Sequence, residues 1–328
     1  LMAYTTIDDP SAYFQTTLYT GDGSTSHAIT NGGNSDLQAD WLWIKSRSST
    51  EQHFVFDSVR GQSKYIFPNA ANAEGTASTG ILNSFNSDGF TLGNNDGVNA
   101  NSETFVAWQW KKVAGVFDIQ TYSGASNTRT ISHNLGVVPK AMIFKRLDDG
   151  AWIVYHADAG GADKYLVLNT NAAVDTATTL FNNTVPTSSV FSVGNTNSTN
   201  GSGIDYVVYL IGNKQGVSKC GSYTGNGNAN GPYIHLGFKP AFVMAKKSSG
   251  TEDWSITDNK MNTFNVCNNK LRPNSTSQES TGNAHIDFTA QGFKWRSTSG
   301  EFNASGSTYI YMAFAENPFV TSSGVPAT

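Results

Sequence analysis

The sequence predicts an all-β protein built from three tandem antiparallel β-sandwich domains of jelly-roll type. Short motifs recur three times at a spacing of about 101 residues, and a fixed period indicates one structural unit used repeatedly. Val, Ile, Thr and aromatic residues form short runs separated by Gly, Asn, Asp and Ser, which is typical of strands joined by turns. No segment of helical length carries a clear 3.6-residue apolar stripe, so the alanine-rich stretches 70–77 and 172–177 are expected to be loops.

Each unit opens with a Tyr-Thr/Ser-Gly signal, continues with a strand that ends in Lys, and closes with an apolar run. The opening signals begin at Tyr19, Tyr122 and Tyr223; the strands end at Lys45, Lys145 and Lys246; a later Phe recurs at Phe90, Phe191 and Phe293; the closing runs begin at Phe105, Tyr206 and Tyr309.

The repeat divides the 328 residues into three units of about 100 residues, a common size for a domain with its own core. Because the connections between units are short, we expect separate β beads that touch one another. The predicted boundaries are an N-terminal attachment arm at 1–17, β-sandwich repeats at 18–114, 115–216 and 217–319, and a polar tail at 320–328.

The closing run of each unit is apolar on consecutive residues, as in 309–315. A strand that is apolar on both faces is buried on both faces. Such a strand lies inside a covered sandwich, or it packs on a neighbouring domain or on another subunit.

Several repeated positions are expected to be structural. Phe54, Trp152 and Trp254 are interpreted as one aromatic core column. The three strand-end lysines are interpreted as solvated ends whose alkyl stems cover apolar surface, in preference to a ligand site. Cys220 and Cys267 are interpreted as small buried apolar residues, and a disulfide between them stays open because their separation is a spatial quantity.

Composition excludes some classes of partner. The net charge of −4 and the pI near 5.8 argue against nucleic acid, because no basic stripe is available to neutralise phosphates. No apolar run approaches the length of a membrane span, and residues 1–10 lack the features of a signal peptide, so no membrane insertion is expected. Charged residues make up only 14% of the chain, and the low charge leaves little to oppose association between surfaces.

No catalytic constellation stands out, so we expect no enzyme activity, no cofactor and no metal site. One column holds Asp57, His156 and Asp258, and its chemistry changes between units. The six histidines are dispersed without zinc-ligand spacing. Acidic pairs for glycoside cleavage can be assembled, but the separation that such chemistry needs cannot be seen in a sequence. The candidate acids are Glu74, Asp88, Glu103, Glu252 and Asp253.

Aromatic residues outside the repeated columns are the candidate ligand or interface residues. Trp41, Trp110 and Trp295 have no aromatic counterparts at the aligned positions of the other units. An exposed ring beside amide side chains could stack on the apolar face of a sugar, whereas a buried ring would belong to the core or to an interface.

Several segments resemble a repeat seen in structural proteins of marine tailed phages of the cyanophage and pelagiphage kind. The segments are 2–10, 56–61, 84–93, 105–111, 237–240 and 309–319. The resemblance is stronger in units one and three than in unit two. It implies a concanavalin-like sandwich and a component of the virion, which could be a tail fibre, a tail knob or a head decoration. It brings no catalytic residues with it.

The sequence therefore predicts a phage virion protein, made in the host cytoplasm, that displays a surface to a host glycan or receptor. A purely architectural decoration or fibre-shaft protein is the first alternative, and a glycan-degrading tailspike is the second. The expected partners are other virion proteins and further copies of the chain, with a trimer favoured. The arm, which mixes Tyr4, Ile7, Tyr13 and Phe14 with polar residues, is expected to hold the chain to the virion.

Overall fold

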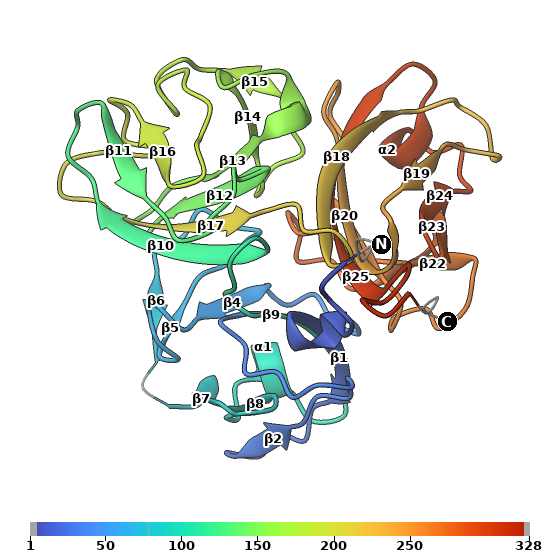
Figure 1. Cartoon of the computed structure of the whole chain (residues 1–328). Coiled ribbons are helices and arrows are strands. Elements are labelled where there is room, and N and C mark those ends of the chain that lie inside the picture. Colours follow the sequence, from blue (N-terminus) through green and yellow to red (C-terminus); the bar gives the residue numbers. More distant parts are fainter. Residues whose placement is uncertain (1–4, 78, 325–328) are drawn as a thin grey trace.

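The computed structural model describes residues 5–77 and 79–324, and it has three lobes around a common centre (Figure 1). Each lobe corresponds to one repeat unit. The all-β class is confirmed, since only short helical turns interrupt the strands. The strand pairings of the described residues are antiparallel.

Unit one begins with a 3-10 turn and ends with a long strand. Its elements are η1 (Pro10–Ala12), β1 (Phe14–Thr20), β2 (His27–Ile29), β3 (Trp41–Ser46), β4 (Phe54–Asp57), β5 (Lys64–Tyr65), β6 (Gly75–Thr76), β7 (Leu82–Phe85), β8 (Phe90–Leu92), α1 (Asp96–Asn99) and β9 (Thr104–Trp110).

Unit two repeats this order. Its elements are β10 (Phe117–Ser123), β11 (Arg129–Ser132), β12 (Ala141–Arg146), β13 (Trp152–His156), η2 (Ala157–Ala159), β14 (Lys164–Val167), β15 (Asp175–Thr176), β16 (Val190–Val193) and β17 (Asp205–Ile211).

Unit three has the longest strands. Its elements are β18 (Ser218–Thr224), β19 (Tyr233–His235), β20 (Phe238–Lys247), β21 (Ser255–Asp258), β22 (Cys267–Lys270), β23 (Ser280–Thr289), β24 (Gly292–Trp295), α2 (Gly300–Asn303) and β25 (Thr308–Pro318).

Each unit has an inner sheet that faces the centre and an outer sheet, which has fewer strands than the inner sheet in units one and two and the same number in unit three. The inner sheets share one strand order: β1-β9-β3-β4, β10-β17-β12-β13 and β18-β25-β20-β21, with β14 and β15 extending the second. The outer sheets are β2-β8-β7, β11-β16 and β19-β24-β23-β22. An apolar core lies between the two layers of each unit.

The Tyr-Thr/Ser-Gly signal joins the first strand of each unit to the loop before its last strand. In unit one the Tyr19 hydroxyl donates to the carbonyl of Val98 at 2.6 Å. A Cβ on Gly21 would lie 2.1 Å from the carbonyl oxygen of Ala100, so only glycine permits this approach of the two backbones. The same hydroxyl bond recurs from Tyr122 to Thr199 and from Tyr223 to Phe302.

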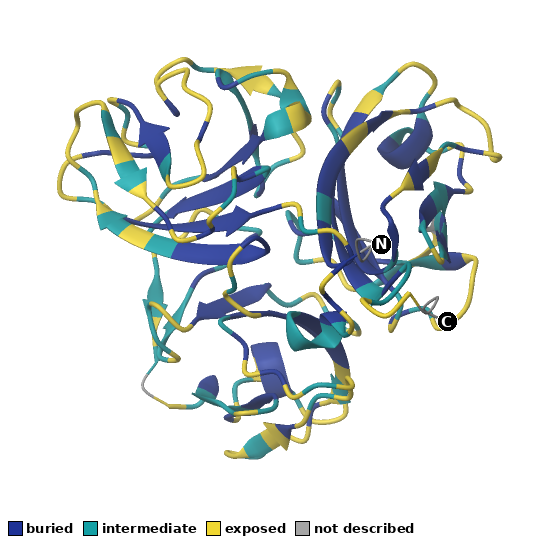
Figure 2. Cartoon of the chain, viewed as in Figure 1, coloured by how far each residue is buried: buried dark blue, intermediate teal, exposed yellow. Residues whose placement is uncertain are grey.

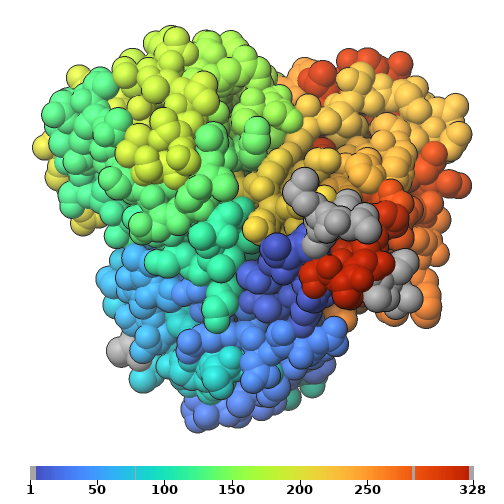
Figure 3. Space-filling model, in the orientation of Figure 1, coloured from blue at the N-terminus to red at the C-terminus, as the bar shows by residue number. Residues whose placement is uncertain are grey.

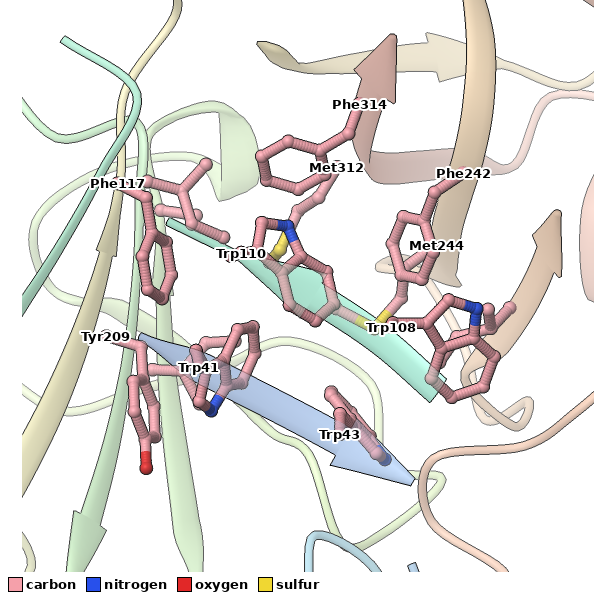
Figure 4. Packing of buried hydrophobic residues seen from close by; sticks show 14 of the residues in the cluster. Trp41, Trp43, Trp108, Trp110, Phe117, Tyr209, Phe242, Met244, Met312 and Phe314 are labelled. Carbon is pink, nitrogen blue, oxygen red and sulfur yellow. The ribbon is translucent and has the colours of Figure 1, made fainter. Parts of the chain in front are cut away.

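The inner faces of the three sheets pack into one shared core (Figure 4). Trp41 and Trp110 of unit one lie at its centre, with ring centroids 4.4 Å apart. Trp41 also stacks on Tyr209 of unit two at 4.6 Å, and Trp110 meets Phe242 of unit three edge-on at 5.5 Å. Rings from all three units therefore form one apolar cluster, which we call the shared core.

The shared core explains the closing strands. β9, β17 and β25 lie inside the inner sheets, with one face on the core of their own unit and the other on the shared core, and most of their residues are buried (Figure 2). Of the alternatives that the sequence left open, packing on a neighbouring unit of the same chain is therefore the one observed. These strands no longer argue for a homotrimer, which stays an untested prediction.

Loops also join the units in a closed ring. A loop of each unit bonds to the turn that follows the Lys-ending strand of the next unit, and the third unit returns to the first, as in a cyclic trimer. The backbone bonds are Gly150 to Ala71, Glu252 to Asn171 and Glu279 to Arg47. Arg47 and Glu279 add an ion pair at 2.7 Å. The units are therefore parts of one body and not the separate beads expected.

Residues 5–17 were expected to have no partner inside the chain, but they pack within it, while their attachment to the virion stays an untested prediction. Residues 14–17 belong to β1, and Phe14 and Ile7 lie in the shared core. The Thr5 hydroxyl donates to the carbonyl of Gln215 at 2.9 Å. Residues 1–4, including Tyr4, lie outside the described residues, as do 325–328 of the predicted tail. Ser322 donates its backbone N–H and its hydroxyl to Asp8, so the two ends lie side by side (Figure 3).

Candidate functional site

The strand-end lysines are fully buried, so their interpretation as solvated residues is wrong. Lys45, Lys145 and Lys246 each have 0% exposure. Each ammonium donates to backbone carbonyls of the following turn, and Lys145 also reaches Ala71 of unit one at 3.1 Å. Burial lowers the pKa of all three lysines to about 8, because a charge is costly away from water. These ammonium groups hold turns together and are closed to a ligand.

The Asp57, His156 and Asp258 column joins one unit to the next. Tyr209 of unit two donates its hydroxyl to Asp57 of unit one at 2.8 Å, and Trp108 of unit one donates Nε1 to Asp258 of unit three at 2.9 Å. The position equivalent to Trp108 and Tyr209 in unit three is Met312, which has no donor.

His156 replaces Asp in this column because Met312 offers no donor to a carboxylate. His156 bonds the backbone carbonyl of Tyr311 through Nε2 at 3.2 Å. Burial lowers the pKa of His156 to about 4, so its imidazole is neutral at pH 7 and can donate. Burial raises the pKa of Asp258 to about 6. The column is a set of contacts between units, and nothing in its geometry indicates catalysis.

The three candidate tryptophans are buried, so none can stack on a sugar from solvent. Trp41 and Trp110 lie in the shared core, and Trp295 stacks on Phe302 at 4.4 Å inside unit three. The strand registers also give Trp41 and Trp110 aromatic counterparts in unit three, namely Phe242 and Phe314. The expectation that these two rings have no counterparts is therefore wrong.

The aromatic column is correct in two units and shifted by one residue in the first. Trp152 and Trp254 are buried, and each backbone N–H donates to an Asn side chain. In unit one the same bond comes from His53, which donates to Asn69 at 3.0 Å, so His53 holds this position. Phe54 is also buried, but it faces the core of its own unit.

The remaining candidate residues serve the fold. Glu74 pairs with Arg60 at 2.9 Å, and Asp253 pairs with Arg272 at 3.0 Å. Glu103 accepts from serine hydroxyls, Asp88 accepts from the backbone of Leu37, and the backbone N–H of Glu252 donates to unit two. Cys220 and Cys267 are buried free thiols that form no disulfide with each other, and burial raises the pKa of the Cys267 thiol to about 12.

Among the described residues, no group of three or more His, Cys, Asp or Glu side chains could hold a metal ion. No helix in this part of the chain is long and apolar enough to cross a membrane.

One loop of unit three projects an aromatic side chain into solvent. Phe264 is 82% exposed and Val266 is 44% exposed. The two residues lie in the connection between β21 and β22, which we call the Phe264 loop (residues 259–266). In unit three the chain leaves β21 at Asp258 and next pairs with that strand at Leu271, which bridges Ile256. The corresponding stretches are shorter in units one and two, from 57 to 66 and from 156 to 166.

The Phe264 loop is tied down on both sides of the exposed ring. The Asn265 side chain donates to the carbonyl of Phe288 at 2.7 Å and accepts from its N–H at 2.9 Å. Asn262 Oδ1 accepts from the backbone of Asn268 at 3.1 Å. An apolar ring is therefore exposed to water on a loop that is anchored on both sides of it. The sequence offers a signal for it, since this is an aromatic among asparagines in a segment that breaks the repeat.

Residues 9–318 match the sequence model of a family described as Domain of unknown function (DUF7483). The match spans all three units. Comparisons with curated proteins and with solved structures give no match.

Proposed function

We propose that this chain, which belongs to the Domain of unknown function (DUF7483) family, is a non-enzymatic phage virion protein that displays the Phe264 loop to a host-surface glycan. The observation that carries the proposal is the exposed ring of Phe264 on a loop fixed by Asn262 and Asn265. The resemblance of the sequence to virion structural proteins supports the same class. The closed ring of units supports a rigid display platform.

The chemistry of the loop favours a sugar as the ligand. A phenyl ring in solvent offers a flat apolar surface for the apolar face of a pyranose, and amide groups bond hydroxyls. One ring contact is weak, so useful attachment comes from several copies on one particle, whose modest affinities multiply without new contacts.

The architectural alternative requires no exposed aromatic loops. Phe264 and Tyr233, which are 82% and 48% exposed, therefore favour display. The tailspike alternative requires two free carboxyl groups about 5–10 Å apart in a cleft. The carboxylates of Glu74, Asp88, Glu103 and Asp253 are instead engaged by arginines, hydroxyls and backbone groups, which leaves Glu252 alone among the acids singled out and favours a non-enzymatic protein.

The proposal is tested by binding of the fluorescently labelled full chain to host cells. Phe264→Ser should lower cell binding about tenfold or more when the chain is presented in many copies on beads, because the loss of affinity at each copy is multiplied over all the copies that bind together. Val185→Ser is the matched control, since Val185 is 61% exposed in unit two and should be neutral. Equal binding of wild type and Phe264→Ser, with both folded, would remove the display function.

Assignment to the virion needs a separate measurement. Gold-labelled antibody against the chain should decorate particles of the phage that encodes it. Absence of the chain from purified particles by mass spectrometry would refute the virion assignment, whatever the cell-binding result.

A further inference from the structure

A cavity of 480 Å³ lies at the seam between units one and three, and we call it the seam cavity. Its volume falls within the range of about 300–1,000 Å³ that is usual for small-molecule sites, which often lie where domains meet. One wall is β1 with residues 30–34, and the other is made by Ala241, the turn after β21 and residues 315–317. Chain segments link the other pairs of units directly, whereas this seam lies between the first and last units.

The repeat is broken on the unit-one wall. Thr16, Ile119 and Cys220 are equivalent, because they pair with the equivalent residues Trp108, Tyr209 and Met312. Ile119 and Cys220 are buried in the shared core. Thr16 instead lines the seam cavity, and its Oγ1 is buried without a hydrogen-bond partner among the described residues. An unpaired buried hydroxyl is unfavourable, and the other two units show that the fold does not need one.

The repeat is also broken on the unit-three wall. Asn259 follows the column residue Asp258, as Ser58 and Ala157 follow theirs, and all three make the same backbone bond across the inner sheet. The side chain is therefore what differs. Asn259 lines the seam cavity, and its Oδ1 lacks a partner in the described part of the chain. At the seam between units two and three, η2 begins at Ala157 and packs directly on β18.

Some other polar side chains of the lining are engaged within the chain. The Gln15 amide bonds backbone groups of Ser11, Gly33 and Ser35. Glu316 pairs with Lys239 at 2.9 Å. The buried groups without a partner are thus a neutral hydroxyl and a neutral amide oxygen, one from each wall, while the exposed Lys260 also lines the cavity. Thr16 Oγ1 and Asn259 Oδ1 are both shielded from bulk water. A ligand in the cavity would therefore bond these atoms only after each side chain rotates toward it.

The apolar part of the lining complements these two oxygens. Leu18, which is 37% exposed, contributes apolar surface to the same cavity, and the buried Phe14, Ala241 and Ala315 lie in its walls. A ligand that presents hydroxyl groups on its edge and C–H groups on its face matches both parts. We infer that the seam cavity is a binding site for a neutral sugar ring, with hydroxyls on Thr16 and Asn259 and the apolar face on Leu18 and Ala315. This site is separate from the Phe264 loop.

The test is ligand-observed saturation-transfer NMR on the full chain with glucose, galactose, mannose and N-acetylglucosamine. We expect saturable binding of at least one of these sugars. Thr16→Val, which keeps the shape and removes the hydroxyl, should weaken it about tenfold or more, a loss that corresponds to one hydrogen bond. Thr121→Val, at an exposed threonine of β10, is the control and should bind like wild type.

Two further variants make the result decisive. Thr16→Ile installs the side chain that unit two carries at this position, so the chain should fold normally and lose binding. Asn259→Ala should also lose binding, whether or not Thr16→Ile folds. No binding of any of the four sugars to wild type would overturn the inference and leave an ordered water as the only occupant. Unchanged binding in Thr16→Val would overturn it as well. Phe264→Ser should bind free sugar here normally, so failure of the display function is distinguishable.

Discussion

Replacement of Lys145 by Met should change how the stability of the chain depends on pH. Burial lowers the pKa of Lys145 to about 8 in the folded chain, against 10.5 when it is exposed. The unfolded chain therefore binds more protons between these two values, and the stability of wild type should rise with pH in this window. The Met variant lacks this contribution.

The size of the effect follows from the same pKa. A lowering from 10.5 to about 8 corresponds to about 3 kcal/mol, since one pKa unit equals about 1.4 kcal/mol. The ammonium donates to the three carbonyls of Ala71, Asp148 and Gly150, whereas a neutral amine has only two N–H groups. We therefore expect wild type to gain about 1–3 kcal/mol over the variant between pH 7 and pH 10.

Urea unfolding at four pH values measures this difference. Comparison with the Met variant cancels the titration of the buried tyrosines, which is common to both chains. Lys112→Met, at an exposed lysine, is the control and should track wild type at every pH. A difference between wild type and Lys145→Met that stays constant within about 0.5 kcal/mol would refute the buried-charge argument.

Three further substitutions test other contacts by equilibrium unfolding. Trp254→Ala should destabilise the chain by about 3–5 kcal/mol, the usual loss for a buried large aromatic, and a change under about 0.5 kcal/mol would contradict its burial. Gly124→Ala should cost about 2 kcal/mol or more, because its Cβ would lie 2.0 Å from the carbonyl oxygen of Gly201, while Gly32→Ala, with open space around it, should be neutral. Tyr209→Phe should cost about 1–3 kcal/mol by removing the hydroxyl bond to Asp57, and an unchanged midpoint would show that the bond contributes nothing.

The sequence predicts the repeat and the strands well because both depend on local pattern. The closing strands, apolar on both faces, correctly indicate a second apolar surface against them. Their pattern says nothing about which surface this is, since a neighbouring unit and another subunit require the same residues. The shared core therefore depends on tertiary packing, which the alternation of apolar and polar residues does not specify.

The lysines show why burial of charged residues was missed. A Lys at a strand end has the same local pattern whether its ammonium meets water or a ring of carbonyls. The carbonyls around Lys145 come from its own turn and from Ala71 in another unit, which the sequence does not bring together.

The candidate site was missed for a related reason. Trp41 and Trp110 were singled out because they lie outside the repeated aromatic columns, but their equivalents in unit two, Ala141 and Ile211, are buried in the same shared core. The sequence alignment placed Phe54 in the aromatic column, whereas the structure places His53 there. An alignment by residue type does not fix the register to one residue, and a shift of one residue moves a side chain to the opposite face of a strand. The sequence signal for the proposed Phe264 site is that it lies where the length of the repeat changes.

Differential scanning calorimetry of the full chain tests the central claim most directly, namely that three repeat units form one body around a shared core. A two-state unfolding has equal calorimetric and van't Hoff enthalpies. The shared core predicts a single transition with a ratio near one, and Trp110→Ala should lower its midpoint without splitting it, because Trp110 contacts Phe14, Phe242 and Phe314 at ring distances of 5.0, 5.5 and 5.6 Å. Three resolved transitions, with only the transition of unit one shifted by the substitution, would contradict the account.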